Sequence, residues 1–214
     1  MNERETSSPA DTGQVLAGRE VIVAVCGGIA AYKVADLVSK LVQRGAGVTV
    51  VMTESATKFV TPLTFQTLSG RMVRTSTWDL PDSSDVQHID LTEKADLMVV
   101  APATANIIAK AATGICDELV STMINAAACP VVFCPAMNNL MWTNPITQEN
   151  VQKLTRLGYR FIGPEEGWLA CRNTGPGRMS EAGSILEAVT QILTAPGAIP
   201  KPVARTILKP NEDV

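Results

Sequence analysis

The segment Glu20–Cys26, EVIVAVC, is the feature that most limits what this chain can fold into. It is a continuous run of mainly β-branched apolar residues, whereas a strand with one solvent-exposed face would alternate apolar and polar residues. The run therefore predicts a strand buried on both faces of a sheet. Gly27 and Gly28 follow at once, and Ala31–Arg44 then has the apolar spacing of an amphipathic helix, which Gly45 closes.

The same alternation of strand and helix continues along the chain. The second strand is expected at Val48–Met52, further buried strands at Asp96–Ala101 and Pro130–Cys134, and a last short strand at Arg160–Ile162. Helices are expected at Thr104–Ala112, Glu118–Ala127, Thr147–Leu157 and Glu181–Leu193. Strands that alternate with helices predict a parallel sheet covered by helices on both faces. The expected fold class is α/β: a doubly wound, Rossmann-like or flavodoxin-like parallel sheet in a single domain.

Composition bounds the class of protein. We expect a disordered polar leader at 1–18, one domain at 19–194, and an extended Pro-rich tail or linker at 195–214. The net charge of −3 gives no reason to expect a nucleic-acid partner, and no apolar run reaches the roughly 20 residues of a membrane span. One histidine and five cysteines without metal-type spacing predict no metal site and free thiols in a reducing cytoplasm.

Small and polar residues stand directly after three of the predicted strands. They are Gly27 and Gly28 after the first strand, Thr53 and Ser55 after the second, and Thr104 and Asn106 after the third. Each segment alone is also explained without a ligand, as a tight βα turn or a helix cap. The carboxyl ends of parallel strands meet at the edge where open α/β sheets bind ligands, so the three together favour a mononucleotide there. The first turn lacks GxGxxG, which argues against a dinucleotide.

Three further segments carry groups that could do chemistry. His88 is the only histidine, but a lone histidine is more often a surface or structural residue than a catalyst. In Cys134–Trp142 the two asparagines could bind a carboxylate or amide, although a capped loop with core residues is the plainer interpretation. Gly167–Met179 is expected to be a loop that could cover a site. In it Cys171 stands beside Arg172, whose charge could favour a thiolate, although an incidental surface thiol also fits.

Together these segments resemble the homo-oligomeric flavin-containing cysteine decarboxylases. The matching motifs are GGIAAYK, QHIDLT, APATAN, PAMNNLMW and WLACRNTGPGRMSE, which span Gly27–Glu181. PAMNNLMW is typical of the decarboxylases within the wider flavoprotein superfamily, and the last motif narrows the resemblance to the phosphopantothenoylcysteine branch. The family usually has glycine directly after the flap cysteine and often an acidic residue next, where this chain has Arg172 and Asn173.

The resemblance implies an FMN-dependent lyase of coenzyme A biosynthesis that turns 4′-phospho-N-pantothenoylcysteine into 4′-phosphopantetheine. His88 would be the base of the oxidative half and Cys171 the proton donor of the reductive half. The implied substrate contacts are Asn138, Met141, Ala170, Arg178 and Met179. The implied FMN contacts are Gly27, Gly28, Ile29, Thr53, Ser55, Phe59, Thr104, Ala105, Asn106 and Asp117. The family further implies a homo-oligomer, a homotrimer or a multiple such as a homododecamer, with sites between subunits.

Three alternatives stay open at this point. Lantibiotic-type peptidyl-cysteine decarboxylases share the histidine and the PxMN element but stop at the enethiol, without need of Cys171. Flavin prenyltransferases share fold and cofactor but are not expected to carry PAMNNLMW. Some relatives are non-enzymatic regulators of phosphatases, and the presence of both His88 and Cys171 favours an enzyme. Bacterial relatives are often the front half of a bifunctional decarboxylase–ligase, so a monofunctional enzyme and a separated piece are both expected possibilities.

Overall fold

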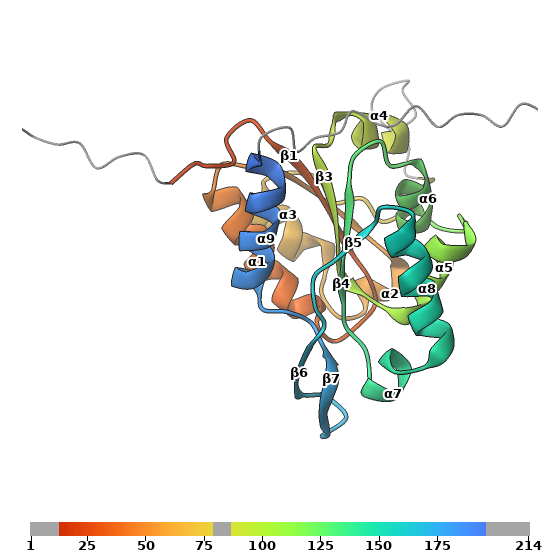
Figure 1. Cartoon of the computed structure of the whole chain (residues 1–214). Helices are drawn as coiled ribbons and strands as arrows, with labels where there is room; N and C mark the ends of the chain where they lie inside the picture. Colours follow the sequence, from red (N-terminus) through yellow and green to blue (C-terminus); the bar gives the residue numbers. More distant parts are fainter. Residues whose placement is uncertain (1–12, 79–86, 196–214) are drawn as a thin grey trace, which may run out of the picture.

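Five parallel strands form the centre of the protein (Figure 1). The computed structural model describes residues 13–78 and 87–195, except for the side chains of residues 87–90. The strands are β1 (Glu20–Val25), β2 (Gly47–Met52), β3 (Leu97–Ala103), β4 (Val131–Pro135) and β5 (Arg160–Phe161), and they lie in the order β2-β1-β3-β4-β5. This is a flavodoxin-like order in a single domain, which confirms the predicted α/β fold class.

The strand order reverses at β1, and this reversal positions the site. Val21 of β1 is paired with Val48 of β2 on one side and with Leu97 of β3 on the other. The chain therefore moves outward from β1 to β2 and later returns to place β3 on the opposite side of β1. Connections that leave β1 and β3 in opposite directions open a crevice at the carboxyl ends of the strands, where open α/β sheets bind ligands.

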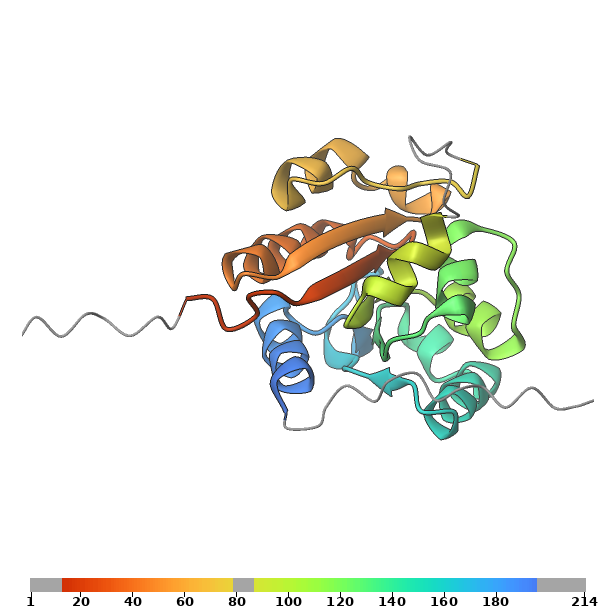
Figure 2. The same ribbon diagram turned by 90° about the horizontal axis from the view of Figure 1, so that it is seen from above.

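Helices cover both faces of the sheet. They are α1 (Ala31–Gln43), α2 (Glu54–Thr57), α3 (Pro62–Ser69), α4 (Gln87–Lys94), α5 (Ala105–Thr113), α6 (Leu119–Ala126), α7 (Asn139–Trp142), α8 (Pro145–Arg156) and α9 (Ala182–Thr194). In Figure 2, α1 and α9 lie on one side of the sheet, and α5, α6 and α8 lie on the other. Each side encloses its own cluster of buried apolar side chains.

The apolar spacing of α1 shows why these elements form a stable layer. Val34, Leu37, Val38 and Leu41 are completely buried against the sheet, as expected for residues three and four apart on one helical face. Burying each such side chain stabilises the fold by about 1.5–3 kcal/mol. Gly45 follows the helix with a φ of 89°, a left-handed conformation that glycine adopts without steric cost.

Helices α2, α3, α4 and α7 were not expected from the sequence, and two further differences concern the flap and the core. The segment Gly167–Met179, expected to be a loop, mostly belongs to an antiparallel hairpin of β6 (Glu165–Trp168) and β7 (Thr174–Arg178). Its residues TGPGR lack the apolar alternation of a strand, because the hairpin stands away from the core (Figure 1). Leu16, placed in the expected disordered leader, is fully buried in the core beside α1 and α9. Residues 1–12 and 196–214 lie outside the described residues.

No helix in the described part of the chain is both long enough and apolar enough to cross a bilayer.

Candidate functional site

The connections after β1, β2 and β3 enclose a cavity of about 280 Å³ at the carboxyl edge of the sheet, which we call the strand-end cavity. Its lining residues are Cys26, Gly27, Thr53, Glu54, Ser55, Thr104, Asn106, Ile107, Lys110, Asp117 and Glu118. Six residues proposed from the sequence as cofactor contacts are among them: Gly27, Thr53, Ser55, Thr104, Asn106 and Asp117. The three strand-end segments therefore come together in one place.

Gly27 brings two of these segments into direct contact. A Cβ atom on Gly27 would clash with the side chain and backbone of Ser55. The turn after β1 can approach the turn after β2 this closely only because residue 27 has no side chain. At Gly28 the nearest atom to an added Cβ would be Cγ2 of Thr104, at 3.6 Å, which is an ordinary contact. Gly28 thus lies against the third segment, next to the cavity.

Thr53 and Thr104 both cap a helix and line the strand-end cavity. The Thr53 hydroxyl accepts a hydrogen bond from the Ala56 N–H at 3.2 Å, and the Thr104 hydroxyl accepts one from the Ile107 N–H at 3.3 Å. The two interpretations left open by the sequence, helix cap and ligand contact, are thus compatible. The cavity borders the N-terminal end of α5, where the helix dipole favours an anion.

Three charged residues that line the strand-end cavity already have hydrogen-bond partners within the chain. The Lys110 ammonium donates to Asp117 at 2.7 Å, and this hydrogen bond holds the pKa of the Asp117 carboxyl below its usual value. The Glu118 carboxylate accepts from the Val120 and Ser121 N–H groups at 3.0 and 2.8 Å and so caps α6. Lys110 and Glu118 were not proposed from the sequence, because neither belongs to a motif that follows a strand directly.

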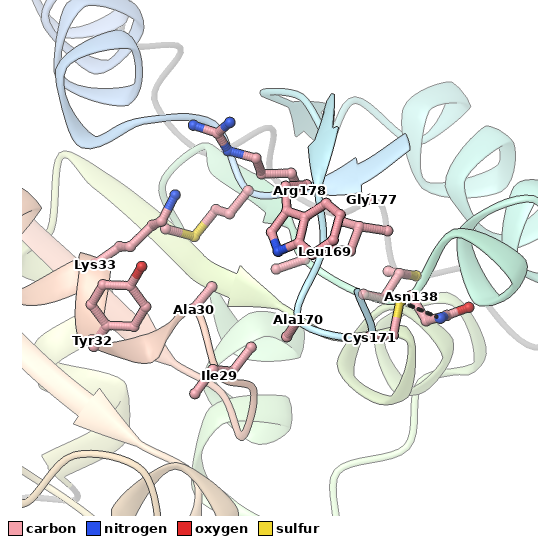
Figure 3. A pocket seen from close by; sticks show the side chains of 14 residues that line it. Ile29, Ala30, Tyr32, Lys33, Asn138, Leu169, Ala170, Cys171, Gly177 and Arg178 are labelled. Carbon is pink, nitrogen blue, oxygen red and sulfur yellow. Dashed lines mark hydrogen bonds between the residues drawn. The ribbon is translucent and has the colours of Figure 1, made fainter. Parts of the chain in front are cut away.

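A second and larger cavity, of about 620 Å³, lies between the turn after β1, the segment after β4, and the β6–β7 hairpin (Figure 3). We call it the flap cavity. Its lining residues are Ile29, Ala30, Tyr32, Lys33, Ala136, Met137, Asn138, Trp168, Leu169, Ala170, Cys171, Gly177, Arg178 and Met179. Most of these residues are apolar, so the few polar side chains among them are the candidates for specific contacts with a ligand.

Asn138 and Cys171 meet in the wall of the flap cavity (Figure 3). The Asn138 amide nitrogen donates to the Cys171 sulfur at 3.2 Å, although the residues are 33 positions apart. The Asn138 amide oxygen accepts from the Leu140 N–H at 2.8 Å and thereby caps α7. This second bond fixes the orientation of the amide, so its NH₂ group is presented to the cavity side.

The hairpin is held against the segment after β4 through its backbone. The Met137 N–H donates to the Gly177 carbonyl at 2.9 Å. Gly177 has a φ of 133°, and a Cβ there would clash with the Met137 carbonyl, so only glycine fits. At the hairpin tip Arg172 has a φ of 63°, which is sterically unfavourable for a residue with a side chain. This left-handed position is the one where the resembling family usually has glycine.

The remaining candidates divide between the two cavities and the space outside them. Ala170, Arg178 and Met179 line the flap cavity, and so does Ile29, which the sequence had suggested as a cofactor contact. Met141, Phe59 and Ala105 line neither cavity, and Met141 and Phe59 are about half exposed. His88 belongs to α4, and its side chain lies outside the described part of the structure.

Three residues that line the flap cavity were not proposed from the sequence: Tyr32, Lys33 and Trp168. The motif GGIAAYK contains the first two, and the flap motif contains the third.

Burial keeps the thiols of Cys26, Cys129 and Cys134 protonated. Burial raises the pKa of Cys134 to about 12 and that of Cys129 to about 11. Burial also raises the pKa of Cys26, so these three side chains stay neutral. Among the described side chains, those of residues 13–78 and 91–195, His, Cys, Asp and Glu form no group of three or more that could hold a metal ion.

Comparisons with known proteins bear on the family of the chain. Residues 10–194 match the family model described as Flavoprotein. The chain is 49% identical over 173 residues to "Coenzyme A biosynthesis bifunctional protein CoaBC" of Bacillus subtilis (strain 168), covering 81% of this chain and 43% of that protein. It thus spans less than half the length of that relative.

Two solved structures are similar over nearly their whole length. A cysteine-to-serine mutant of PPC decarboxylase complexed with pantothenoylaminoethenethiol has a TM-score of 0.72 and 33% identity, over 80% of this chain and 96% of that one. The FMN-dependent cysteine decarboxylase SpaF has a TM-score of 0.68 and 30% identity, over 81% of this chain and 98% of that one.

Proposed function

The chain belongs to the Flavoprotein family, and we propose that it is an FMN-dependent decarboxylase acting on 4′-phospho-N-pantothenoylcysteine to give 4′-phosphopantetheine in coenzyme A biosynthesis. The similar CoaBC protein is a coenzyme A biosynthesis protein, and the similar solved structures are PPC and FMN-dependent cysteine decarboxylases. The meeting of Asn138 and Cys171 in the flap cavity is the observation that carries the proposal furthest.

The residues of the strand-end cavity fit FMN. The N-terminal end of α5 favours the phosphate, hydroxyls of Thr53, Ser55 and Thr104 can contact the ribityl chain, and Gly27 leaves room for close approach of the backbone. Ile29 follows Gly28 in the turn after β1 and lines the flap cavity. We therefore assign the strand-end cavity to the cofactor and the flap cavity to the substrate.

The chemistry needs a way to stabilise the electrons left behind by CO₂. When bound, oxidised FMN accepts a hydride equivalent from the CH₂–SH carbon of the substrate cysteine and later returns it, so no external reductant is needed. His88 takes the thiol proton in the oxidation, because an imidazole can act as a general base at neutral pH. The carbon–sulfur bond becomes C=S, and this group accepts the electron pair of the broken C–CO₂ bond as an enethiolate.

Asn138 and Cys171 act before and after CO₂ loss. The Asn138 amide NH₂, free to leave the Cys171 sulfur for a stronger acceptor, donates to the substrate carboxylate and orients it. Once CO₂ has left, the Cys171 thiol gives its proton to the carbon that carried the carboxylate. The apolar wall of the flap cavity excludes water from the enethiolate until that proton arrives.

The direct test is to incubate the FMN-loaded protein with phosphopantothenoylcysteine and to follow CO₂ and 4′-phosphopantetheine by mass spectrometry. We expect both products in equal amounts. His88→Asn should retain FMN and lose turnover by at least about 100-fold, or about 2.7 kcal/mol of barrier. Absence of both products from the wild-type holoprotein would overturn the proposal.

A peptidyl-cysteine decarboxylase is the competing function, since SpaF is also similar in structure. Cys171 separates the two functions because only the complete reaction needs a proton donor after CO₂ loss. Cys171→Ser should release CO₂ and then accumulate bleached flavin with an enethiol two hydrogens lighter than phosphopantetheine. Normal phosphopantetheine at the normal rate from this variant would leave Cys171 without a role and favour the peptidyl reaction.

We also propose that the active form is a homo-oligomer, a trimer or a multiple of it. Large apolar side chains next to the site are exposed in the single chain, among them Ile29, Tyr32, Leu140 and Trp168. Such side chains near a site favour burial against a further subunit. Light scattering on the holoprotein should give a mass that is a multiple of three chains, and full activity in a monomer would contradict this.

A further inference from the structure

The flap cavity has only two charged residues in its lining, and both are cations. Lys33 comes from the first turn of α1, and Arg178 comes from the end of β7 (Figure 3). No carboxylate lines the cavity. The charged groups in this mostly apolar wall are therefore both cations.

A single carboxylate outside the cavity holds the two cations together. The Lys33 ammonium donates to Oε1 of Glu181 at 2.9 Å, and the Arg178 guanidinium donates to the same oxygen. The hydrogen bond from Arg178, and next the one from Lys33, hold the pKa of the Glu181 carboxyl below its usual value. The carboxylate therefore stays charged at neutral pH. Glu165, opposite Arg178 in the hairpin, is the other acidic side chain that acts on Arg178. Neither Glu165 nor Glu181 lines the flap cavity, so a ligand in the cavity would contact the two cations rather than the two carboxylates.

The two cations and the reactive pair lie at different ends of the flap cavity. In Figure 3, Lys33 and Arg178 stand on one side, and Asn138 and Cys171 on the other. The proposed substrate has the same polarity, because its cysteine is at one end and its phosphate ester at the other. We propose that Lys33 and Arg178 bind the 4′-phosphate of the substrate, and so select a phosphorylated small molecule over a peptide. This inference rests on the proposed function.

The geometry suits a phosphate monoester. Arg178 can offer two parallel N–H groups to phosphate oxygens, and Lys33 adds a compact charge. Lys33 stands at the N-terminal end of α1, where the helix dipole also favours an anion. The phosphate is expected to share the cations with Glu181 from the cavity side.

A plainer explanation is that Lys33, Arg178 and Glu181 only tie α1, β7 and α9 together. That role predicts equal losses for any substrate when Lys33 is changed. Phosphate binding predicts that only the phosphorylated substrate suffers the full loss, so the ratio of kcat/KM for phosphorylated and unphosphorylated substrate separates the two explanations.

The experiment compares phosphopantothenoylcysteine with pantothenoylcysteine in the FMN-loaded wild type, Lys33→Met, Lys33→Arg and Arg178→Gln. The matched control is Lys40→Met, because Lys40 lies two turns further along α1, is paired with Asp36, and does not line the cavity. We expect wild type and Lys40→Met to prefer the phosphorylated substrate by about 100-fold, consistent with two charge-assisted contacts. Lys33→Met and Arg178→Gln should each reduce this preference about tenfold, mainly through KM, and Lys33→Arg should restore most of it.

A binding measurement keeps the inference independent of turnover. Calorimetric titration of the holoprotein with 4′-phosphopantetheine and with pantetheine should show the same phosphate preference and the same loss in Lys33→Met. If wild type decarboxylates neither substrate, the proposed function fails while this titration still decides the phosphate site. If wild type treats both substrates or both ligands alike, or if Lys33→Met and Arg178→Gln keep the full preference, the inference is overturned.

Discussion

The strand-end cavity and the flap cavity are adjacent but are built from different kinds of structure. The strand-end cavity is formed by turns that leave buried parallel strands, with helix caps and a glycine contact that the sheet itself fixes. The flap cavity depends on a two-stranded hairpin that stands away from the sheet and meets the segment after β4 through the Met137–Gly177 bond. We infer that the cofactor end is rigid before binding, whereas the substrate end can open.

The largest difference should come from filling the glycine contact at the strand-end cavity. In Gly27→Ala the new Cβ would clash with Ser55, so the turns after β1 and β2 must separate. We expect FMN affinity to fall by at least about 100-fold, or about 2.7 kcal/mol, measured by flavin fluorescence titration. Gly183→Ala is the control, because an added Cβ there meets nothing within 4 Å. Unchanged FMN affinity in Gly27→Ala would contradict the inference that the strand-end cavity is rigid before FMN binds.

The corresponding change at the flap should separate turnover from cofactor binding. Gly177→Ala places a Cβ against the Met137 carbonyl at a φ of 133°, which displaces the hairpin. We expect kcat/KM to fall by about 10–100-fold, or about 1.4–2.7 kcal/mol, with FMN affinity within twofold of wild type. Steady-state kinetics and FMN titration on the same sample test both halves. A parallel loss of FMN would show that the two cavities form one unit.

A smaller effect is expected where cap and ligand contact are the same residue. Thr104→Ala removes the hydroxyl that caps α5, which should cost about 1 kcal/mol of stability in the FMN-free protein. Denaturant unfolding measures this cost, and FMN titration measures the accompanying loss of cavity contact. Thr104→Ser keeps the hydroxyl and should behave like wild type in both assays. If Thr104→Ala lost stability but kept its full FMN affinity, the hydroxyl would be a cap alone.

The smallest effect should be a gain at the hairpin tip. Arg172→Gly relieves a left-handed conformation that costs a residue with a side chain roughly 1–2 kcal/mol, partly offset by the flexibility of glycine. The net gain should be about 0.5–1 kcal/mol in hairpin closure, visible as slower exchange of the Leu169 N–H that donates to Asn173. Arg172→Ala removes the charge but keeps the strain, so its exchange rate should not change. An equal gain in both variants would point to the charge.

The same contrast explains which parts were predictable from the sequence. Thr53 and Thr104 were predicted to lie at one edge of the sheet because the carboxyl ends of buried parallel strands meet there. The position of each residue directly after a strand was therefore enough to predict that the two are close in space. The hairpin was expected to be a loop, because its pairing is satisfied by backbone bonds between residues such as Gly167 and Gly175, which have no strand-like side chains. The contribution of Lys33 was missed because nothing local to GGIAAYK reveals that Arg178 and Glu181 will face it.

The position of Trp168 makes the hairpin visible to fluorescence. Its indole lines the flap cavity from β6 and is 66% exposed in the single chain, so its emission should change when a ligand or a neighbouring subunit covers it. The other two tryptophans, Trp78 and Trp142, can be replaced by phenylalanine without touching the residues that line either cavity. A ligand that closes the hairpin would shift the remaining emission to shorter wavelength, and neighbouring oxidised flavin would quench it. The flap thus contains an intrinsic chromophore with which opening and closing can be timed without an added label.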